Sequence, residues 1–340
     1  MREDEPVADA RPRLRDVAQR ANTSLSLASY ALNGSGRVSA ETRERVLQAA
    51  HELGYRSNRY ARMLRTGQRE DIGVIIRNMR NPMFLDVLKA LEEGSRARGQ
   101  ALLVTSSHYD AAEQQDLLDH LVDLGVGKIV IAPVGGLSRL RAWQERHQDI
   151  HLVALHADDG GDDPVPSVAT VNPDHHAAVR LCVEYAAERG HRTIDFVAAP
   201  AEQAADTARE TAFEHVCAEH GIEGVVRHTR LNAGVVADFL AEDLRSRHDH
   251  PCYLFNSDYL AAVAYSVATS MGRQVGRDLS VIGHDDLPTS ALLAPALTTV
   301  AFDRSRVGAE ALRLVIDGAK ERVEVPVELR ARDSVARLTD

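Results

Sequence analysis

Short apolar runs alternate with amphipathic helical patterns over most of this chain, and no other feature of the sequence restricts the fold as strongly. Beyond residue 71, four apolar runs of four or five residues are separated by helical patterns at 83–98, 111–124 and 137–147. The runs lie at 72–76, 101–104, 128–132 and 152–155. Such alternation is typical of parallel sheets that are covered by helices on both faces.

The alternation resumes after a polar loop at residues 157–167. Further apolar runs lie near 194–198, 225–228, 252–255 and 279–282. The length of this region predicts an α/β core of two parallel-sheet, Rossmann-like units in tandem. Ligands bind such sheets at the carboxyl ends of the strands, so we expect a binding cleft between the two units.

The first 55 residues follow a different pattern, that of three short helices. Apolar residues at 14, 17, 18 and 21 share one helical face, and Ser24 is suited to cap a second helix that ends at Asn33. A third helix begins after Ser39 and runs to Gly54. Its expected inward residues are Val46, Leu47, Ala50 and Leu53. The tight turn between the first two helices predicts an all-α helix-turn-helix head.

Charge is divided unequally between these two regions. Residues 11–69 hold twelve arginines against four acidic residues, a net charge of +8. The whole chain carries -10 and residues 1–10 carry -3, which leaves -15 for residues 70–340. A basic module joined to an acidic body favours a polyanion such as double-stranded DNA as the partner of the head, although a solvated arginine-rich surface would give the same balance.

The remaining composition excludes several classes of protein. The first ten residues are acidic and lack the apolar stretch of a signal peptide, and no apolar run approaches the length of a membrane span. We therefore expect a cytoplasmic protein that associates with the nucleoid when bound to DNA. The three cysteines lie about 35 residues apart, a spacing that fits neither a disulfide framework nor a zinc site. No metal and no cofactor are predicted.

Several motifs, in their order and spacing, give the chain a specific resemblance to a known family. They include LRDVAQRA, VSAETRERVLQAAHELGY, ARMLRTG, FNSDYLAAVA and LSVIGHDDL. From about Arg13 to Ser334 the sequence resembles a transcriptional regulator of the LacI/GalR family. The resemblance implies a DNA-binding head, a hinge helix and a core of the periplasmic-binding-protein-like type I fold. It also implies a homodimer and a small-molecule effector.

The resemblance also implies domain boundaries. We expect a disordered tail at 1–12, the helix-turn-helix domain at 13–57 and a hinge at 58–69. The first core subdomain should comprise 70–171 and 301–326, and the second 172–300 and 327–340. No heptad pattern follows the last strand, so we expect a two-fold dimer and not a dimer of dimers.

By the same resemblance, the second helix of the head reads DNA. Leu25, Ser26 and Tyr30 would face bases, and Ser24, Ser29 and Asn33 would lie nearer the phosphates. The sequence departs from the family pattern at three positions. Tyr30 replaces a base-reading arginine, Leu27 a common threonine, and Arg13 the usual cap of the first helix. Leu25 and Leu27 would alternatively pack against the first helix, and for Leu27 this packing is the expectation.

The segment NRYARMLRTGQR surrounds a leucine with arginines. In this family the matching segment forms a short helix on specific DNA and inserts a leucine into the minor groove. An apolar wedge kinks the duplex, and arginine contacts to phosphate offset the cost of unstacking. The wedge is carried over to Leu64, with Ala61 and Arg62 beside it and Arg59 and Arg65 among the DNA-binding residues. The alternative is an amphipathic linker whose Leu64 packs on the core.

For the effector, the resemblance indicates Arg209 and Asp258, with four weaker candidates, Asn78, Phe84, Phe255 and Asp285. A guanidinium and a carboxylate each bind adjacent hydroxyl groups, which suits a sugar or a nucleoside-like metabolite. Surface or interdomain salt bridges would explain the same two residue types. His156 stands where an aspartate is frequent, and it could, with His284, make binding depend on pH.

Two other classes of function compete with a repressor whose operator affinity an effector modulates. One is a cytosolic sugar- or nucleotide-processing enzyme with a helical appendage, but the sequence has no P-loop, GxSxG or HExxH motif. Asp285 and Asp286 could act as acid and base, although neighbouring residues of a strand point to opposite faces. The other is a secreted sugar-binding protein, which a basic head argues against. We predict no catalytic residues.

Overall fold

The chain is a helical head followed by a two-lobed α/β core. A computed structural model describes residues 12–33, 38–55, 71–157, 166–200, 202–203 and 207–338. The chain divides into two compact units, residues 1–68 and 69–340. The predicted hinge residues Arg59, Ala61, Arg62, Leu64 and Arg65 lie outside the described residues.

Three helices form the head: α1 (Leu14–Arg20), α2 (Leu25–Asn33) and α3 (Ala40–Glu52). They enclose a small core of valine and alanine side chains, which includes Val17, Ala28 and Val46. The helix ends follow the sequence signals. The Ser39 hydroxyl accepts a hydrogen bond from the backbone N–H of Thr42, and Gly54 adopts a left-handed conformation just after α3.

Two details of the head differ from expectation or refine it. Leu47, expected inward, is 51% exposed, and Ala49 is buried instead, because a helix turns 100° per residue and carries Leu47 past the edge of the buried face. At the start of α1, Arg13 has no acceptor in its side chain, and the Asp16 carboxylate instead accepts a hydrogen bond from the backbone N–H of Arg13.

The first lobe of the core is built on a six-stranded sheet in the order β11-β5-β4-β3-β1-β2. Its strands are β1 (Ile72–Ile76), β2 (Leu102–Ser106), β3 (Lys128–Ile131), β4 (His151–Leu155), β5 (Ala169–Pro173) and β11 (Arg322–Val325). Every pairing in this sheet is parallel. Strand β1 is buried along its whole length, as expected for a strand covered on both faces.

The second lobe repeats the arrangement, with strand order β12-β10-β9-β8-β6-β7. Its strands are β6 (Thr193–Ala198), β7 (Glu223–His228), β8 (Cys252–Phe255), β9 (Ser280–His284), β10 (Thr298–Phe302) and β12 (Val327–Arg330). Only the pairing of β10 with β12 is antiparallel among the described strands of this sheet. The predicted fold class is therefore confirmed.

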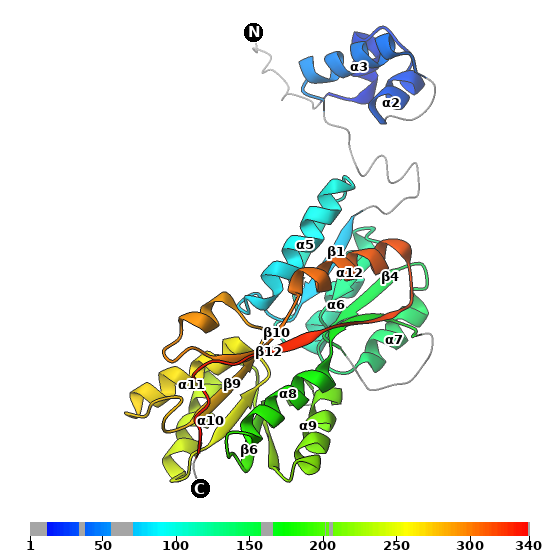
Figure 1. Cartoon of the computed structure of the whole chain (residues 1–340). Coiled ribbons are helices and arrows are strands. Elements are labelled where there is room, and N and C mark those ends of the chain that lie inside the picture. Colours follow the sequence, from blue (N-terminus) through cyan, green and yellow to red (C-terminus); the bar gives the residue numbers. More distant parts are fainter. Residues whose placement is uncertain are drawn as a thin grey trace, which may run out of the picture. The chain divides into compact units, whose positions relative to one another are not determined.

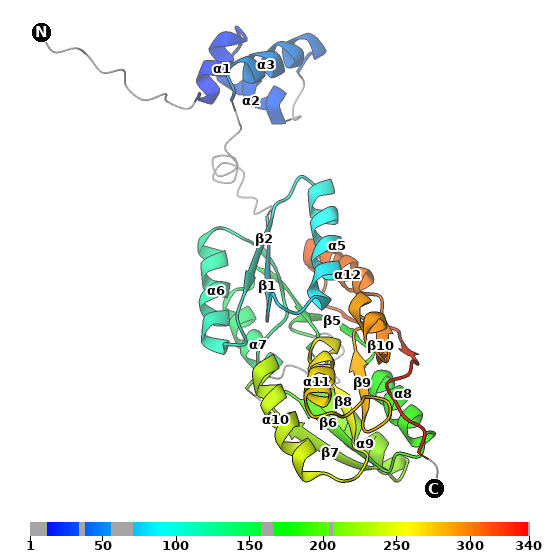
Figure 2. The ribbon, with the colours of Figure 1, turned by 90° about the vertical axis from the view of Figure 1, so that its left-hand side faces the viewer.

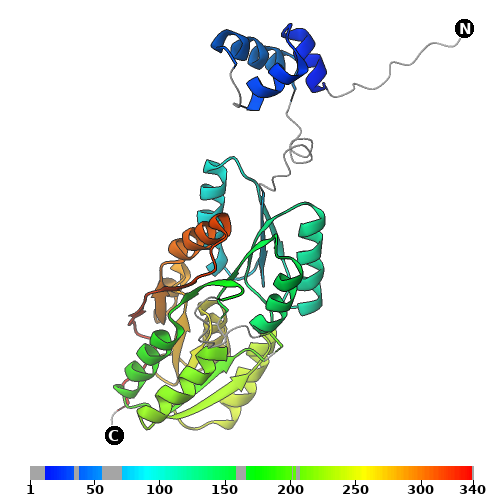
Figure 3. The same ribbon diagram turned by 90° about the vertical axis from the view of Figure 1, so that its right-hand side faces the viewer.

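Helices cover both faces of each sheet (Figures 1 and 2). In the first lobe, α5 (Met83–Ala97) and α12 (Arg304–Asp317) lie side by side on one face, and α6 (Ala111–Asp123) and α7 (Leu137–Arg146) cover the other (Figure 3). In the second lobe, α8 (His175–Ala187) and α9 (Thr207–Glu219) oppose α10 (Ala233–Ser246) and α11 (Asp258–Ser270). A short 3-10 helix, η1 (Pro288–Leu292), follows β9.

The chain passes between the lobes three times: after β5, after β10 and between β11 and β12. The subdomain boundaries expected at 171/172 and 300/301 fall inside β5 and β10, since the chain changes lobes only where these strands end. Neither strand was expected, because their sequences, ATVNP and TTVAF, contain polar residues that break the apolar run. Eight core strands and the helices α5, α6 and α7 agree with the expected ranges to within two residues at each end, whereas β11 was not expected.

Candidate functional site

The exposed face of α2 is the first candidate site. Leu25 and Tyr30 are 54% and 47% exposed, and Ser26 is exposed as well. Ser26 and Tyr30 are four residues apart and therefore share a helical face. Ala28 and Ala31 lie on the opposite face and anchor α2 in the head core. The three side chains that were expected to face bases are therefore all exposed.

The side chains expected near phosphates are placed differently. The Ser24 hydroxyl caps α2 by accepting a hydrogen bond from the backbone N–H of Leu27, and its own O–H remains able to donate to another acceptor. Ser29 is buried, because it lies next to Ala28 on the inward face of α2. The side chain of Asn33 lies outside the described residues. Leu27, expected to pack against α1, is 38% exposed.

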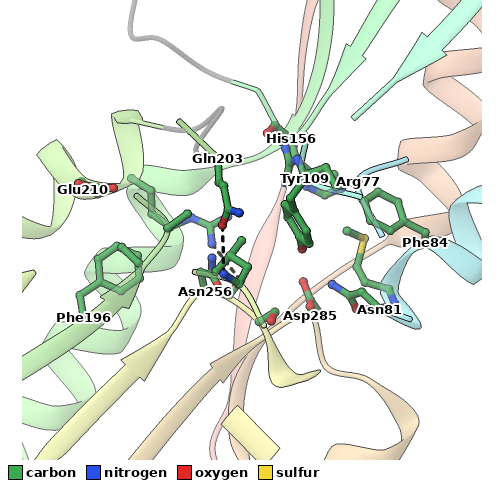
Figure 4. Close-up of a pocket in the computed structure, with 16 residues that line it drawn as sticks. Arg77, Asn81, Phe84, Tyr109, His156, Phe196, Gln203, Glu210, Asn256 and Asp285 are labelled. Carbon is green, nitrogen blue, oxygen red and sulfur yellow. Dashed lines mark hydrogen bonds between the residues drawn. The ribbon is translucent and has the colours of Figure 1, made fainter. Parts of the chain in front are cut away.

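The second candidate site is a cleft in the core. Both lobes line it, and it opens to solvent. Figure 4 shows Arg77, Phe84, Tyr109 and His156 on the side of the first lobe, with Gln203 and Asn256 on the side of the second. Asp285, at the end of β9, lies between the two groups. The cleft has the mixed apolar and polar lining of a small-molecule site.

Arg209, on α9, is held at the wall of the second lobe. Its Nη1 donates a hydrogen bond to the backbone carbonyl of Asn256 at 3.2 Å, and its Nη2 donates to Nδ1 of His175 at 3.0 Å. The imidazole of His175 must be neutral at Nδ1 to accept this bond. Burial lowers the pKa of His175 well below its usual value, and the nearby Arg209 lowers it further. A neutral histidine therefore positions the guanidinium.

Asp285 is buried beside His284, whose Nδ1 lies 3.2 Å from its Oδ1. Burial raises the pKa of Asp285 to about 8, against the opposing effect of Arg209 and Arg304. The carboxyl group of Asp285 is therefore mainly protonated and uncharged near neutral pH. The second oxygen, Oδ2, has no hydrogen-bond partner among the described residues, so it is available to a ligand in the cleft.

Two further side chains that line the cleft also have a buried polar atom without a hydrogen-bond partner among the described residues. His156 Nε2 and Asn256 Oδ1 are buried and have no partner within the described part of the chain. Burial lowers the pKa of His156 well below its usual value, and Arg77 adds to the shift. Arg77 itself donates to the backbone carbonyls of Pro133 at 2.8 Å and of His156 at 2.6 Å. These contacts fix one wall of the cleft.

Three of the expected effector residues do not line the cleft. Asp258 is buried inside the second lobe, where its carboxylate accepts hydrogen bonds from the hydroxyls of Ser290 and Thr299 and from the backbone N–H of Leu287. Phe255 is buried in the core between β8 and the helices α10 and α11. Asn78 accepts a hydrogen bond from the backbone N–H of Arg80 two residues away. Phe84, Arg209 and Asp285 do line the cleft.

Arg304 connects the two lobes beside Asp285. It begins α12 of the first lobe, and its Nε donates to the carboxylate of Asp86 on α5 at 2.8 Å. Its Nη1 donates to the backbone carbonyls of Asp285 and Asp286, which follow β9 of the second lobe. Both aspartates have positive φ angles, an unusual backbone conformation that turns their carbonyls toward the guanidinium. A ligand that moves Asp285 would therefore disturb the contact of Arg304 with α5.

Sequence reasoning missed Arg77, Tyr109, Asn256 and Gln203 as lining residues. A usable signal existed for two of them, since Arg77 follows β1 and Asn256 follows β8 directly, at the carboxyl ends where ligands bind. Tyr109 lies beyond a turn after β2, and Gln203 lies in a loop. For these two residues the sequence carries no periodic signal.

Two family models match the chain. Residues 13–58 match the bacterial regulatory proteins of the lacI family, and residues 183–335 match the periplasmic binding protein-like domain. The first match falls on the helix-turn-helix head and the second on the core that carries the cleft. The chain belongs to the LacI family of bacterial regulatory proteins.

Curated relatives match this LacI-family regulator over nearly its whole length. It is 29% identical to the HTH-type transcriptional repressor PurR of Erwinia tasmaniensis, with 95% of this chain and 96% of the relative covered. It is 28% identical to the ribose operon repressor of Halalkalibacterium halodurans, with 94% and 96% covered.

Solved structures show the same fold. The Lac repressor dimer bound to operator and the anti-inducer ONPF superposes with a TM-score of 0.84 at 24% identity, covering 96% of this chain and 100% of that one. The transcriptional regulator CelR in complex with cellobiose gives a TM-score of 0.69 at 22% identity, covering 95% and 100%.

Family membership decides between a regulator, an enzyme and a secreted binding protein. This LacI-family protein is a DNA-binding transcriptional regulator with an effector-binding core, and it is not an enzyme. The two aspartates at the end of β9 have separate structural settings. Asp285 lines the cleft, whereas Asp286 forms an ion pair with Arg332 at 2.6 Å.

The described residues do not meet the requirements of a metal site or of a membrane-spanning helix. Within the described residues, no three His, Cys, Asp or Glu side chains converge in a way that could hold a metal ion. None of the helices in the described ranges combines the length and hydrophobicity that a bilayer crossing needs. The three cysteines are buried and unpaired with one another.

Proposed function

We propose that this regulator represses transcription as a cytoplasmic homodimer, and that a small molecule bound in the cleft changes its affinity for the operator. The proposal rests on a cleft that both lobes of the core line. Three buried polar atoms of its lining, Asp285 Oδ2, Asn256 Oδ1 and His156 Nε2, have no hydrogen-bond partner among the described residues. A closed cleft with a bound ligand would satisfy these groups, and an open one would leave them to water.

The proposed effector is a sugar or a nucleoside-like metabolite. Asp285 Oδ2 and Asn256 Oδ1 offer acceptors for hydroxyl or N–H groups, and the side chain of Arg209 lines the adjoining wall. Phe84 supplies an apolar surface at the rim. The relative named ribose operon repressor is compatible with a sugar as the effector.

Arg304 is the proposed link between the effector and the rest of the protein. Its contacts join the backbone next to Asp285 in one lobe to Asp86 on α5 in the other. An effector would shift the balance between core states only by its differential affinity for them. The shift would alter the separation of the two hinges in the dimer and so the stability of a short hinge helix, which is marginal on its own. Both induction and corepression are compatible with this scheme.

On the DNA side, we propose that Leu25, Ser26 and Tyr30 read bases in the major groove and that Leu64 opens a base step in the minor groove. Ser24 and the arginines at 59, 62 and 65 would contact phosphates. Leu64→Ala should weaken binding to the specific site far more than binding to random DNA. Equal losses on both, measured by fluorescence anisotropy at one salt concentration, would assign Leu64 a role in folding alone.

Two experiments test the proposed function. A gel-shift selection of genomic fragments with the full chain should recover near-palindromic sites whose binding is salt-sensitive. A thermal-shift screen of sugars and nucleosides should find a compound that raises the melting temperature of the core. Failure to recover any preferred site would contradict the proposal. A stable tetramer in sedimentation would contradict the dimer.

A further inference from the structure

The recognition surface of α2 is unusually apolar for a helix that binds DNA. Leu25, Leu27 and Tyr30 are 54%, 38% and 47% exposed. None of the three belongs to the hydrophobic core of the head, which the alanines of α2 supply instead. Large apolar side chains exposed together on one short helix indicate a surface that a partner covers.

The same helix lacks the side chains that usually distinguish base pairs by paired hydrogen bonds. Its sequence, LSLASYALN, contains no arginine, lysine, glutamine or acidic residue. A bidentate contact to guanine or adenine needs such a side chain. Asn33, at the end of the helix, is the only residue of this type in α2. Hydrogen bonding at the centre of the surface is therefore limited to the hydroxyls of Ser26 and Tyr30.

We propose that Leu25 and Leu27 read the operator through apolar contact with the C5-methyl groups of thymines in the major groove. This inference rests on the proposed function and specifies its chemistry. The thymine methyl is the only apolar group on a base edge in that groove. Leu25 and Leu27 are two residues apart and therefore lie about 200° apart around α2, so the methyls they contact lie on opposite sides of the base that Ser26 faces.

Charge complementarity favours DNA over protein as the occupant of this surface. Residues 11–69 carry a net charge of +8, whereas residues 70–340 carry -15. In a complex with DNA, basic side chains of the head would hold phosphates and bring the uncharged face of α2 against the bases. An apolar protein surface would bury the leucines equally well. It would, however, leave the hydroxyls of Tyr30 and Ser26 without hydrogen-bond partners.

Deoxyuridine tests the proposal because it differs from thymidine only by the methyl group. A duplex selected from a random pool by the full chain is resynthesised with one thymine at a time replaced by deoxyuridine. Binding is measured by fluorescence anisotropy. Each methyl that touches Leu25 or Leu27 should weaken binding about four-fold when it is removed, and two together about fifteen-fold.

Variants connect the effect to the two leucines. L25A and L27A should each bind the thymine and deoxyuridine duplexes equally at one position, while the other position keeps its preference. L47A is the matched control, because Leu47 is equally exposed but lies on α3. It should retain the full thymine preference at both positions. Circular dichroism of each variant establishes that the head remains helical.

Three outcomes would overturn the proposal while leaving the proposed function intact. The first is site-selective binding that is indifferent to deoxyuridine at every position. The second is a selected site with no thymine opposite α2. The third is an unchanged thymine preference in L25A and L27A, accompanied by altered sedimentation of the free protein, which would make this face a protein contact. The absence of any site-selective binding would instead contradict the proposed function itself.

Discussion

The helical head and the core depart from the usual distribution of side chains in opposite directions. The head leaves leucines and a tyrosine exposed on α2, whereas the core buries arginine, aspartate and histidine side chains around its cleft. Each departure has a stability cost that a suitable ligand would relieve. The head therefore presents an apolar surface to a charged polymer, and the core presents hydrogen-bonding groups to a small polar molecule.

Within the core, some buried polar groups have hydrogen-bond partners and others have none among the described residues. Asp258 and Asp285 are both buried carboxyl groups in the second lobe. Asp258 accepts three hydrogen bonds from its own lobe, and Asp285 Oδ2 accepts none from the described residues. The first therefore has a structural setting and the second is the proposed ligand group, although sequence motifs marked both as effector residues.

Asp258→Ala should produce the largest effect. It leaves two hydroxyls and one backbone N–H without an acceptor, and each costs about 1–3 kcal/mol, so the core should lose about 3–5 kcal/mol of unfolding free energy. The fluorescence of Trp143, the only tryptophan, reports unfolding of the core in urea. Asp238→Ala, at an exposed position of α10, should change stability by less than about 0.5 kcal/mol. A loss of unfolding free energy below about 1 kcal/mol in Asp258→Ala would contradict the structural role of Asp258.

Arg304→Gln should cost less, about 2 kcal/mol, because it removes one ion pair and the hydrogen bonds to two backbone carbonyls. The comparison is Arg306→Gln, two residues further along α12 and exposed. Arg304→Gln also tests whether Arg304 couples the two lobes. In this variant, amide exchange at Asp86 and at residues 285–287 should increase together. An increase in one lobe only would argue against a link through Arg304.

Asp285→Asn should change the dependence of stability on pH. The pKa of Asp285 is about 8 in the folded core and near 4 when unfolded, so between these values the folded state holds a proton that the unfolded state releases. The unfolding free energy of the wild type should therefore fall as pH rises, by up to about 1.4 kcal/mol per pH unit. Asp285→Asn should abolish this fall. Parallel profiles in the two proteins would mean that Asp285 is ionised.

The pKa of His156 is shifted in the opposite sense, so His156→Gln should change the dependence of stability on pH on the acid side. The folded pKa of His156 is well below 6.5, because burial and the charges of Arg77 and Arg209 disfavour the imidazolium. His175 and His284, which also face it, disfavour the imidazolium as well. Stability is thus lost as pH falls below about 6.5, by at most about 1.4 kcal/mol per pH unit for this residue.

His156→Gln should reduce that acid slope, measured by urea unfolding between pH 5 and 7. His120→Gln, at an exposed position of α6, is the control and should leave the slope as it is. An acid slope that is the same in His156→Gln and the wild type would show that this imidazole is already charged in the folded core.

Leu25→Ala should have the smallest effect on stability, below about 0.5 kcal/mol, because the side chain is exposed and outside the head core. Val46→Ala, fully buried in that core, should cost about 2 kcal/mol. Thermal unfolding followed by circular dichroism at 222 nm compares the two. A large loss in Leu25→Ala would assign the leucine to packing and would weaken the contrast between head and core.

Most of the fold was predictable because it rests on local periodicity. The three helices of the head and eight of the core strands coincide with patterns that can be read directly from the chain. The strands β5 and β10 were missed because their residues are buried by neighbouring strands and helices, and not by their own apolar character. Leu47 was misplaced for a similar reason, since the edge of a buried helical face depends on what packs against it.

The candidate sites were predictable only in part. Motif position identified α2, Arg209 and Asp285 correctly as surface or cleft residues, but it did not separate Asp285 from Asp258, 27 positions earlier in the chain. That separation depends on Ser290 and Thr299, whose hydroxyls reach Asp258 from other parts of the second lobe. Arg304 likewise carries no signal in the sequence, because its role arises from the crossing of the chain between lobes.

The sequence by itself determined the family, the alternation of strands and helices, the segregation of charge and the uncharged, apolar character of α2. These properties depend on residue identity and on spacing along one element. Only the tertiary structure decided which buried polar groups are satisfied and which face the cleft. Hydrogen-bond partners come from segments up to 41 residues apart in the case of Asp258 and Thr299, and no local pattern encodes such a distance.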